Sequence, residues 1–208
     1  MIKNNIFRGF NGTILAYGQT GSGKTYTMGT SFGQSSDGGI IPRSVEQIFK
    51  TADEFKGSVT INLSYLEIYN EEVKDLLSDA QDDAQDLTVR EGIDGSVTVQ
   101  NLTYKEVKTS GDVGDLMSQA SLRRATAATQ MNAVSSRSHA ICTLYIVATP
   151  SSSSESTDGA EPEQISSKFT LVDLAGSERA KRTGAEGTRL KEGININKGL
   201  FVLGQVIR

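Results

Sequence analysis

Alternating hydrophobic and polar positions predict several β-strands in this chain. Within 59–65 every second side chain is apolar, and a period of two is typical of a strand with one buried face. Apolar runs at 139–148 and 168–174 predict two further strands. A shorter run at 12–17 predicts a fourth, which ends directly in a glycine-rich segment.

Apolar residues three or four positions apart predict helices elsewhere. One such face runs through 113–120, and another runs through 196–207. Pro42 suits the first turn of a helix that continues through Phe49. Helices interspersed with strands favour a single α/β domain whose helices flank a central sheet.

Two connections have distinct compositions. Asp94-Gly95 separates segments 87–90 and 96–100, which predicts a β-hairpin. Residues 149–167 are rich in Ser, Glu, Asp and Pro, and we expect a variable, solvated acidic loop there.

Composition changes the picture little. The 208 residues are 37% hydrophobic and 22% charged, which is typical of a globular protein. The single cysteine, Cys142, lies in an alternating apolar run, which favours a small buried side chain over a catalytic thiol. We find no apolar run of membrane-spanning length and no signal peptide, and we expect a soluble intracellular protein.

Charge is unevenly distributed along the chain. The net charge is -4, yet the segment 179–198 carries six Lys and Arg against two Glu. A basic segment on an acidic protein is either a docking surface for an acidic partner or a solvated charged face.

The segment Gly18–Thr25, GQTGSGKT, fits the phosphate-binding pattern G-x-x-x-x-G-K-[ST]. Its glycines let the backbone wrap a phosphate, Lys24 balances phosphate charge, and the Thr25 hydroxyl is placed to ligate magnesium. The preceding strand and following helix favour this interpretation over a flexible Gly/Ser turn.

A second candidate part of a phosphate-binding site is the strand that ends at Asp173, followed by Leu-Ala-Gly176. A carboxylate at the tip of such a strand can hold a magnesium shell. The pattern Asp-x-x-Gly is typical of a γ-phosphate sensor, because glycine lets its N–H approach the phosphate closely.

A third candidate part of this site is the polar segment 132–139, NAVSSRSH, which lies directly before a strand. Alone it is typical of a capped turn. His139, the single histidine, is a candidate general base, although its neighbours favour hydrogen bonds that lock the loop.

Four stretches together resemble the motor domain of kinesins: AYGQTGSGKTYTM, YLEIYNEEVKDLL, NAVSSRSHAI and LVDLAGSERAKRTGAEGTRLKEGININKGL. They occur in the family's order across the chain. The variants MNAVSSRSHAI and GTRLKEGININKGL are most similar to the kinesin-4 branch.

The resemblance implies an ATPase that uses Mg and ATP. It implies a phosphate loop at 18–25, switch I at 132–139 and switch II at 173–178. The implied nucleotide-binding residues are Gly18, Gln19, Thr20, Gly21, Ser22, Gly23, Lys24, Thr25 and, beside the adenine, Tyr26.

The resemblance also assigns catalytic roles. Thr25 and Ser136 are the implied magnesium ligands, with Asp173 acting through water, and Ser135 holds the attacking water. Gly176 senses the γ-phosphate. Glu178 relays a proton through water and pairs with Arg137 across the closed site.

Microtubules are the implied partner, and the location is the cytoplasm and its cytoskeleton. The implied tubulin contacts are Arg179, Lys181, Arg182 and Lys198, the last on a tubulin-facing helix over about 190–208. Neither nucleic acid nor membrane is an expected partner.

The implied fold is a P-loop NTPase of kinesin type, with a central mostly parallel or mixed sheet, flanking helices and one β-hairpin. We expect residues 1–208 to be a partial motor domain, incomplete at both ends. The chain lacks the family's N-terminal Arg-x-Arg-Pro segment and any sustained heptad repeat, so dimerisation would need a stalk that is not present here. We expect the isolated chain to be marginally stable and to bind nucleotide poorly.

The implied function is an ATP-dependent microtubule motor that couples hydrolysis to movement. Two alternatives stay open: a non-motile, nucleotide-gated protein that regulates microtubule dynamics, and a truncated head without activity of its own. A switch GTPase should carry Asn-Lys-x-Asp, but Asn197-Lys198 is followed by Gly199-Leu200, and no acceptor site typical of a kinase is recognised.

Overall fold

The computed structural model describes residues 2–29, 38–78, 86–130, 136–151, 163–178 and 188–207. The elements in chain order are α1 (Ile2–Asn5), the 3-10 helix η1 (Ile6–Arg8), β1 (Gly12–Ala16), α2 (Lys24–Met28), α3 (Ile40–Glu54), β2 (Gly57–Tyr69), β3 (Glu72–Asp75), β4 (Thr88–Glu91), β5 (Val97–Gln100), β6 (Lys105–Glu106), α4 (Ser110–Gln130), β7 (Ser138–Pro150), β8 (Ile165–Asp173) and α5 (Thr188–Val206).

The central sheet has the strand order β1-β8-β7-β2-β3, and β6 also pairs with β2. β1 and β8 run parallel, whereas β8–β7, β7–β2, β2–β3 and β2–β6 are antiparallel. The predicted mixed sheet is therefore confirmed. Within the described residues it is not mostly parallel, because the long strands β2, β7 and β8 pair directly as antiparallel neighbours.

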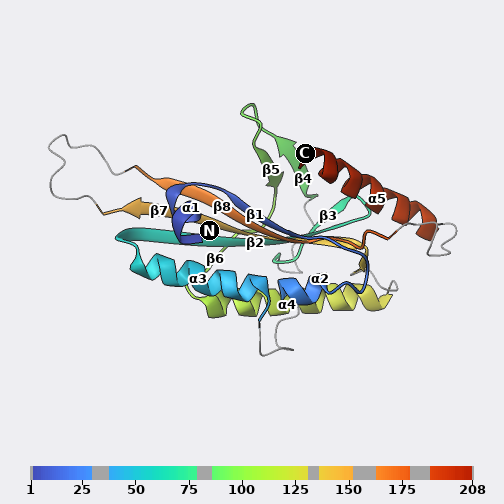
Figure 1. Ribbon diagram of the computed structural model, residues 1–208, viewed down its shortest axis with the longest axis horizontal. Helices are drawn as coiled ribbons and strands as arrows, with labels where there is room; N and C mark the ends of the chain where they lie inside the picture. The colour runs from blue at the N-terminus through green and yellow to red at the C-terminus, as the bar shows by residue number, and fades with distance from the viewer. Residues whose placement is uncertain are drawn as a thin grey trace.

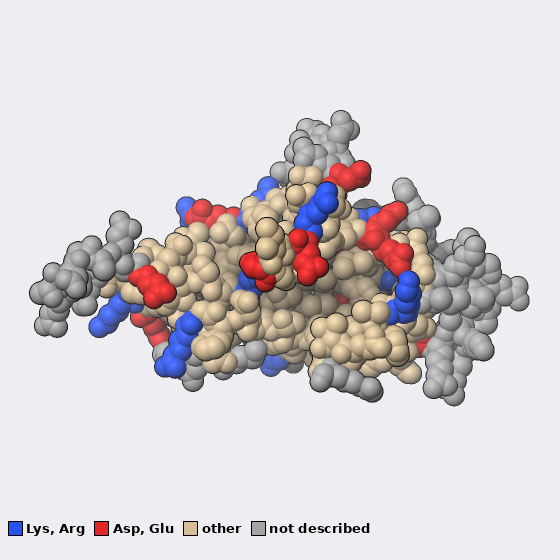
Figure 2. Space-filling model, turned by 90° about the horizontal axis from the view of Figure 1, so that it is seen from above, with Lys and Arg blue, Asp and Glu red and all other residues tan. Residues whose placement is uncertain are grey.

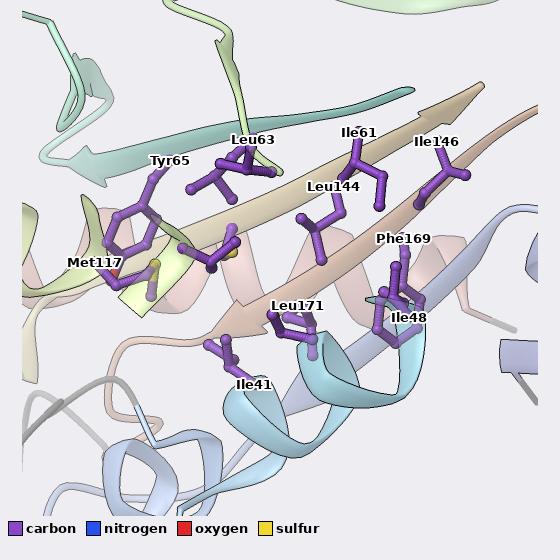
Figure 3. Packing of buried hydrophobic residues seen from close by; sticks show 14 of the residues in the cluster. Ile41, Ile48, Ile61, Leu63, Tyr65, Met117, Leu144, Ile146, Phe169 and Leu171 are labelled. Carbon is purple, nitrogen blue, oxygen red and sulfur yellow. The ribbon is translucent and has the colours of Figure 1, made fainter. Parts of the chain in front are cut away.

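Helices α3 and α4 lie along one face of the sheet, while α5 and the β4–β5 hairpin lie on the other (Figure 1). Figure 3 shows the packing: Ile41 and Ile48 of α3 approach Phe169 and Leu171 of β8, and Met117 of α4 lies beside a strand residue, Tyr65. The apolar face predicted for 113–120 thus forms part of the buried core.

The predicted helices and strands are present. β2, β7 and α4 are longer than predicted, whereas β1 ends one residue earlier, at Ala16. The loop expected at 149–167 is shorter than predicted: β7 continues to Pro150 and β8 begins at Ile165. Ser166 and Ser167 pair with Val147 and Ile146 because main-chain pairing does not depend on apolar side chains. Residues 152–162 of that loop lie outside the described residues.

The predicted hairpin is β4–β5, paired from Thr88↔Gln100 to Glu91↔Val97. Gly95 has φ +76° in its turn, a left-handed conformation that favours glycine. The Asp94 carboxylate accepts hydrogen bonds from the N–H and hydroxyl of Ser96, at 3.0 and 2.7 Å, and these lower the pKa of Asp94.

Phe169 is fully buried at the centre of this core, whereas Phe10 is 63% exposed. We expect Phe169→Ala to lower the free energy of unfolding by about 3–5 kcal/mol, because it removes apolar contacts and leaves a cavity. Chemical denaturation measures this, with Phe10→Ala as the matched control. Equal effects of the two substitutions would contradict the assigned core.

Figure 2 shows the face that carries α5 and the hairpin, on which the Lys and Arg side chains of the described residues are interspersed with Asp and Glu. Among the described helices, none is both long enough and apolar enough to cross a bilayer.

Candidate functional site

The glycine-rich loop 18–25 connects the end of β1 to α2. Gly21 and Gly23 have φ angles of +79° and +88°, which residues other than glycine rarely adopt. A Cβ at Gly18 would come within 2.6 Å of the Ser22 hydroxyl, which would have to move, and the φ of +156° at Gly18 also favours glycine. The Lys24 ammonium donates to the carbonyls of Gly18 and Gln19, at 2.8 and 2.9 Å, and thereby lies across the loop.

Asp173 brings the end of β8 to this loop. Parallel pairing places Asp173 opposite Ala16, immediately before the loop. The Thr25 hydroxyl donates to Asp173 Oδ2 at 2.7 Å. Asp173 is 6% exposed, and its other oxygen, Oδ1, has no hydrogen-bond partner in the described part of the chain.

Glu178 also contacts the loop. Its carboxylate accepts hydrogen bonds from the N–H and hydroxyl of Thr20, at 2.9 and 2.6 Å. Partial burial raises the pKa of Glu178, but the Thr20 hydrogen bonds and the nearby Lys24 charge outweigh it, so the pKa is lowered overall. The carboxylate therefore stays ionised and bonded to Thr20 at neutral pH.

Gly176 lies directly beneath this contact. A Cβ there would meet Glu178 Oε2 at 2.3 Å and Thr20 Oγ1 at 2.4 Å. Its N–H donates to the carbonyl of Ser136 at 2.8 Å, and the Ser177 N–H donates to the Gly18 carbonyl at 3.1 Å. The segment 173–178 is thus bonded to both the glycine-rich loop and the segment before β7.

His139 belongs to the same junction. Its Nδ1 accepts a hydrogen bond from the Ala175 N–H at 3.1 Å. Burial lowers the pKa of His139, against the opposing effect of Asp173, so the ring is neutral at pH 7. This contact supports the loop-locking interpretation over a general base, because Nδ1 is occupied by a main-chain donor.

The pairing of Arg137 with Glu178 is not the contact seen here. The Glu178 carboxylate bonds to Thr20, while Arg137 lines a neighbouring cavity with His139. The Arg137–Glu178 pair therefore stays a prediction for a closed site. Likewise, the Gly176 N–H donates to Ser136 and would have to exchange partners to face a phosphate.

The remaining predicted residues divide by location. Tyr26 is 70% exposed on α2, and Lys198 is exposed on α5. Ser135, Arg179, Lys181 and Arg182 lie outside the described residues.

Sequence reasoning missed the contact of α5 with this junction. The Asn197 side chain donates to the main-chain carbonyl of Glu178 at 3.2 Å. The predicted helical stripe describes only the apolar side of α5, and nothing local marks Asn197 as a contact. The helix is thus bonded to the residue whose carboxylate meets Thr20.

A buried ion pair behind the site was also missed. Arg124 of α4 donates to Glu67 of β2 at 2.9 Å, and the Ser138 hydroxyl donates to the same carboxylate oxygen at 2.6 Å. Glu67 interrupts the apolar run of its strand, and that is the signal the sequence offers. The cluster fixes the beginning of β7, next to Ser136.

A magnesium ion fits the chemistry of this junction. Groups of three or more His, Cys, Asp or Glu suited to a metal are absent from the described ranges. Magnesium in nucleotide sites instead keeps several waters and uses few protein oxygens together with phosphates. The orphaned, buried Asp173 Oδ1 suits an acceptor for such a water.

Comparisons with known proteins agree on one family. The family model described as "Kinesin motor domain" matches residues 1–208. "Kinesin-like protein KIN-4C" of Oryza sativa subsp. japonica is 49% identical over 98% of this chain, and "Chromosome-associated kinesin KIF4A" of Homo sapiens is 45% identical over 97%. This chain spans 17% and 16% of those two proteins, respectively.

Solved structures give the same result for the fold. The chain is 40% identical to a structure described as a fast kinesin, with a TM-score of 0.78 over 94% of this chain and 53% of that one. It is 39% identical to a KIF14 dimer with AMP-PNP in complex with a microtubule, with a TM-score of 0.81 over 99% of this chain and 57% of that one.

Proposed function

Because the chain belongs to the kinesin motor domain family, we propose that it is the catalytic part of an ATP-dependent microtubule motor. The observation that supports this proposal best is the junction itself. Thr20 and Thr25 of the glycine-rich loop bond to Glu178 and Asp173, and the Gly176 N–H donates to the carbonyl of Ser136. Three segments distant in sequence meet there, as a nucleotide switch requires. It follows from this proposal that the protein acts in the cytoplasm, on the microtubule cytoskeleton.

The loop 18–25 binds the triphosphate. Its main-chain N–H groups cradle the phosphates, and the Lys24 ammonium exchanges the carbonyls of Gly18 and Gln19 for phosphate oxygens. Thr25 and Ser136 would hold magnesium directly, Asp173 would hold it through water, and Tyr26 would lie beside the adenine. Magnesium, when bound, would neutralise phosphate charge.

Hydrolysis depends on positioning around the γ-phosphate, because phosphoryl transfer passes through a loose transition state. In the closed site, Ser135 holds the attacking water and the Gly176 N–H turns from Ser136 to the phosphate. Glu178 leaves Thr20 for Arg137, and the new ion pair closes the site. Glu178 then relays the proton of the attacking water.

Replacing Glu178 with alanine is expected to leave ATP binding largely intact and to lower kcat about a hundredfold or more, because the ion pair and the proton relay are both lost. Arg137→Ala should lower kcat similarly. Steady-state ATPase assays and nucleotide titrations measure the two effects, with Glu46→Ala, exposed on α3, as the control. Wild-type turnover in either variant would remove the ion pair from the mechanism.

Microtubule binding is assigned to α5 and the segment before it. Lys198 is exposed, and Arg179, Lys181 and Arg182 add positive charge that complements acidic tubulin. The bond from Asn197 to Glu178 provides a direct path between this helix and the phosphate site. Linkage then requires nucleotide and microtubule to change each other's affinity by the same factor.

The test of the proposed function is ATP turnover with and without microtubules. We expect turnover to rise with microtubule concentration and to fall when salt screens the contacts. A gliding assay separates a motor from a non-motile, nucleotide-gated binder. Turnover that is indifferent to microtubules would contradict the proposal.

A further inference from the structure

The ion pair between α4 and the sheet belongs to a closed triangle of hydrogen bonds. Arg124 of α4 donates from Nε to Glu67 Oε1 at 2.9 Å and from Nη2 to the Ser138 hydroxyl at 3.1 Å. That hydroxyl donates to the same Glu67 oxygen at 2.6 Å. Glu67 and Ser138 are 3% and 1% exposed, so the triangle is largely shielded from solvent.

Such a triangle is a poor source of stability. Taking a carboxylate and a guanidinium out of water is costly, and apolar side chains of similar volume often replace a buried ion pair without loss of stability. Glu67 follows Tyr65 and Leu66, which are both buried, so an apolar side chain would suit this part of β2. The triangle is better explained by the segments that it holds in place.

The register of the sheet connects the triangle to Asp173. Glu67 pairs with Ala140, and Ala140 pairs with Asp173, so the three residues form one row across β2, β7 and β8. Directly paired residues point to the same face, and two strand spacings of about 5 Å separate the two carboxylate positions. Burial lowers the pKa of Arg124, but Tyr65 and the two carboxylates of this row outweigh burial and raise it overall. The charged guanidinium thus interacts with both carboxylates.

The triangle also holds the beginning of β7, where two residues contact the segment after β8. The carbonyl of Ser136, two positions before Ser138, accepts a hydrogen bond from the Gly176 N–H at 2.8 Å. His139, one position after Ser138, accepts one at Nδ1 from the Ala175 N–H at 3.1 Å. A shift of Ser138 would therefore move both contacts.

We propose that Arg124 and Glu67 are positioning residues for ATP hydrolysis. Through Ser138 they hold the Ser136 carbonyl against the Gly176 N–H. The loop before β7 and the segment after β8 therefore start from one fixed geometry before the γ-phosphate draws the glycine away. The role in turnover rests on the function proposed above, whereas the positioning of the two segments does not.

Hydrogen exchange tests the positioning in a complete motor domain that contains this chain, with MgADP bound. MgADP lacks the γ-phosphate, so the Gly176 N–H should keep its bond to Ser136. Ser138→Ala should speed exchange of the Gly176 and Ala175 amides at least about tenfold, because both lose a fixed acceptor. The amide of Leu144, in the middle of β7 and paired on both sides, should exchange as in the wild type.

The matched control is Ser167→Ala, since Ser167 is 5% exposed and its hydroxyl has no hydrogen-bond partner in the described part of the chain. It should leave the exchange of the Gly176 amide unchanged. Equal exchange of this amide in the wild type and in Ser138→Ala would overturn the proposal. Equally faster exchange at Leu144 would also overturn it, because the triangle would then serve overall stability.

A variant without the polar groups separates positioning from folding. Arg124→Met, Glu67→Met and Ser138→Ala together leave no member of the triangle buried without a partner. We expect a melting temperature close to that of the wild type and MgADP affinity within about threefold. We expect kcat to fall at least about tenfold, because small misplacements in a positioned site slow the reaction strongly.

Arg124→Lys provides a second measurement, because lysine keeps the charge but lacks the forked donors that bond to Glu67 and Ser138 together. It should lower kcat at least about threefold with MgADP affinity little changed, whereas Ser167→Ala should not change kcat. Turnover within about twofold of wild type in a folded triple variant would overturn the proposal. If the triple variant does not fold, wild-type turnover in Arg124→Lys would overturn it instead.

The failure of this proposal and that of the proposed function are distinguishable. If the wild-type motor domain shows no ATP turnover, the proposed function fails. Hydrogen exchange at Gly176 and Ala175 still decides whether the triangle positions the two segments.

Discussion

In a complete motor domain that contains this chain, Lys24→Ala is expected to lower ATP turnover roughly a thousandfold and to abolish tight nucleotide binding, because one ammonium bridges the loop and balances the phosphate charge. In the structure this ammonium donates to the carbonyls of both Gly18 and Gln19, so the substitution also removes two hydrogen bonds that shape the loop. Titration with a fluorescent ATP analogue measures the binding loss.

Lys50→Ala is the control for this prediction, since Lys50 is exposed on α3 and is not part of the loop 18–25. It should leave both turnover and affinity unchanged. Retention of micromolar ATP binding in Lys24→Ala would contradict the assignment of 18–25 as the phosphate loop.

Gly176→Ala is the second large effect that we expect. A methyl group at this position would lie 2.3 Å from Glu178 Oε2 and 2.4 Å from Thr20 Oγ1, well inside van der Waals contact. Either the Glu178–Thr20 contact breaks or the backbone of 176 moves away from the glycine-rich loop. We expect kcat to fall at least about a hundredfold, since the same glycine must approach the γ-phosphate.

The matched control is Gly204→Ala, where the added methyl group meets no atom within 4 Å and turnover should be within about twofold of wild type. A melting curve for each variant separates loss of activity from loss of folding. Normal turnover in a folded Gly176→Ala protein would contradict the close packing of the three segments and the sensor role of Gly176.

Local patterns predicted most of the fold. The alternation within β2 and the apolar face of α4 arise because one face of each element is buried. The spacing of apolar residues in the sequence therefore predicts them directly. The strand pairing was harder to predict from the sequence, since antiparallel contacts such as Ile61↔Ile146 join residues far apart in the chain. The sequence therefore left open whether the sheet is mostly parallel or mixed, and the structure shows that it is mixed.

The candidate site likewise combines features that local sequence predicts with contacts that it does not. The glycine-rich loop is contiguous, and its geometry follows from a local motif. By contrast, the contacts of Glu178 with Thr20 and of Asn197 with Glu178 depend on how β8 and α5 are placed in space. The resemblance predicted a partner for Glu178 in a closed site, whereas the structure contains a different contact of the same carboxylate.

The most direct test of the proposed linkage is microtubule affinity in two nucleotide states, measured by cosedimentation of the protein with MgADP and with a non-hydrolysable ATP analogue. Coupling between two ligands is typically worth 5–150-fold in affinity, and we expect binding to be at least about tenfold tighter with the analogue. Equal microtubule affinity in the two states would contradict the claim that the γ-phosphate, acting through Glu178 and α5, controls the grip on tubulin.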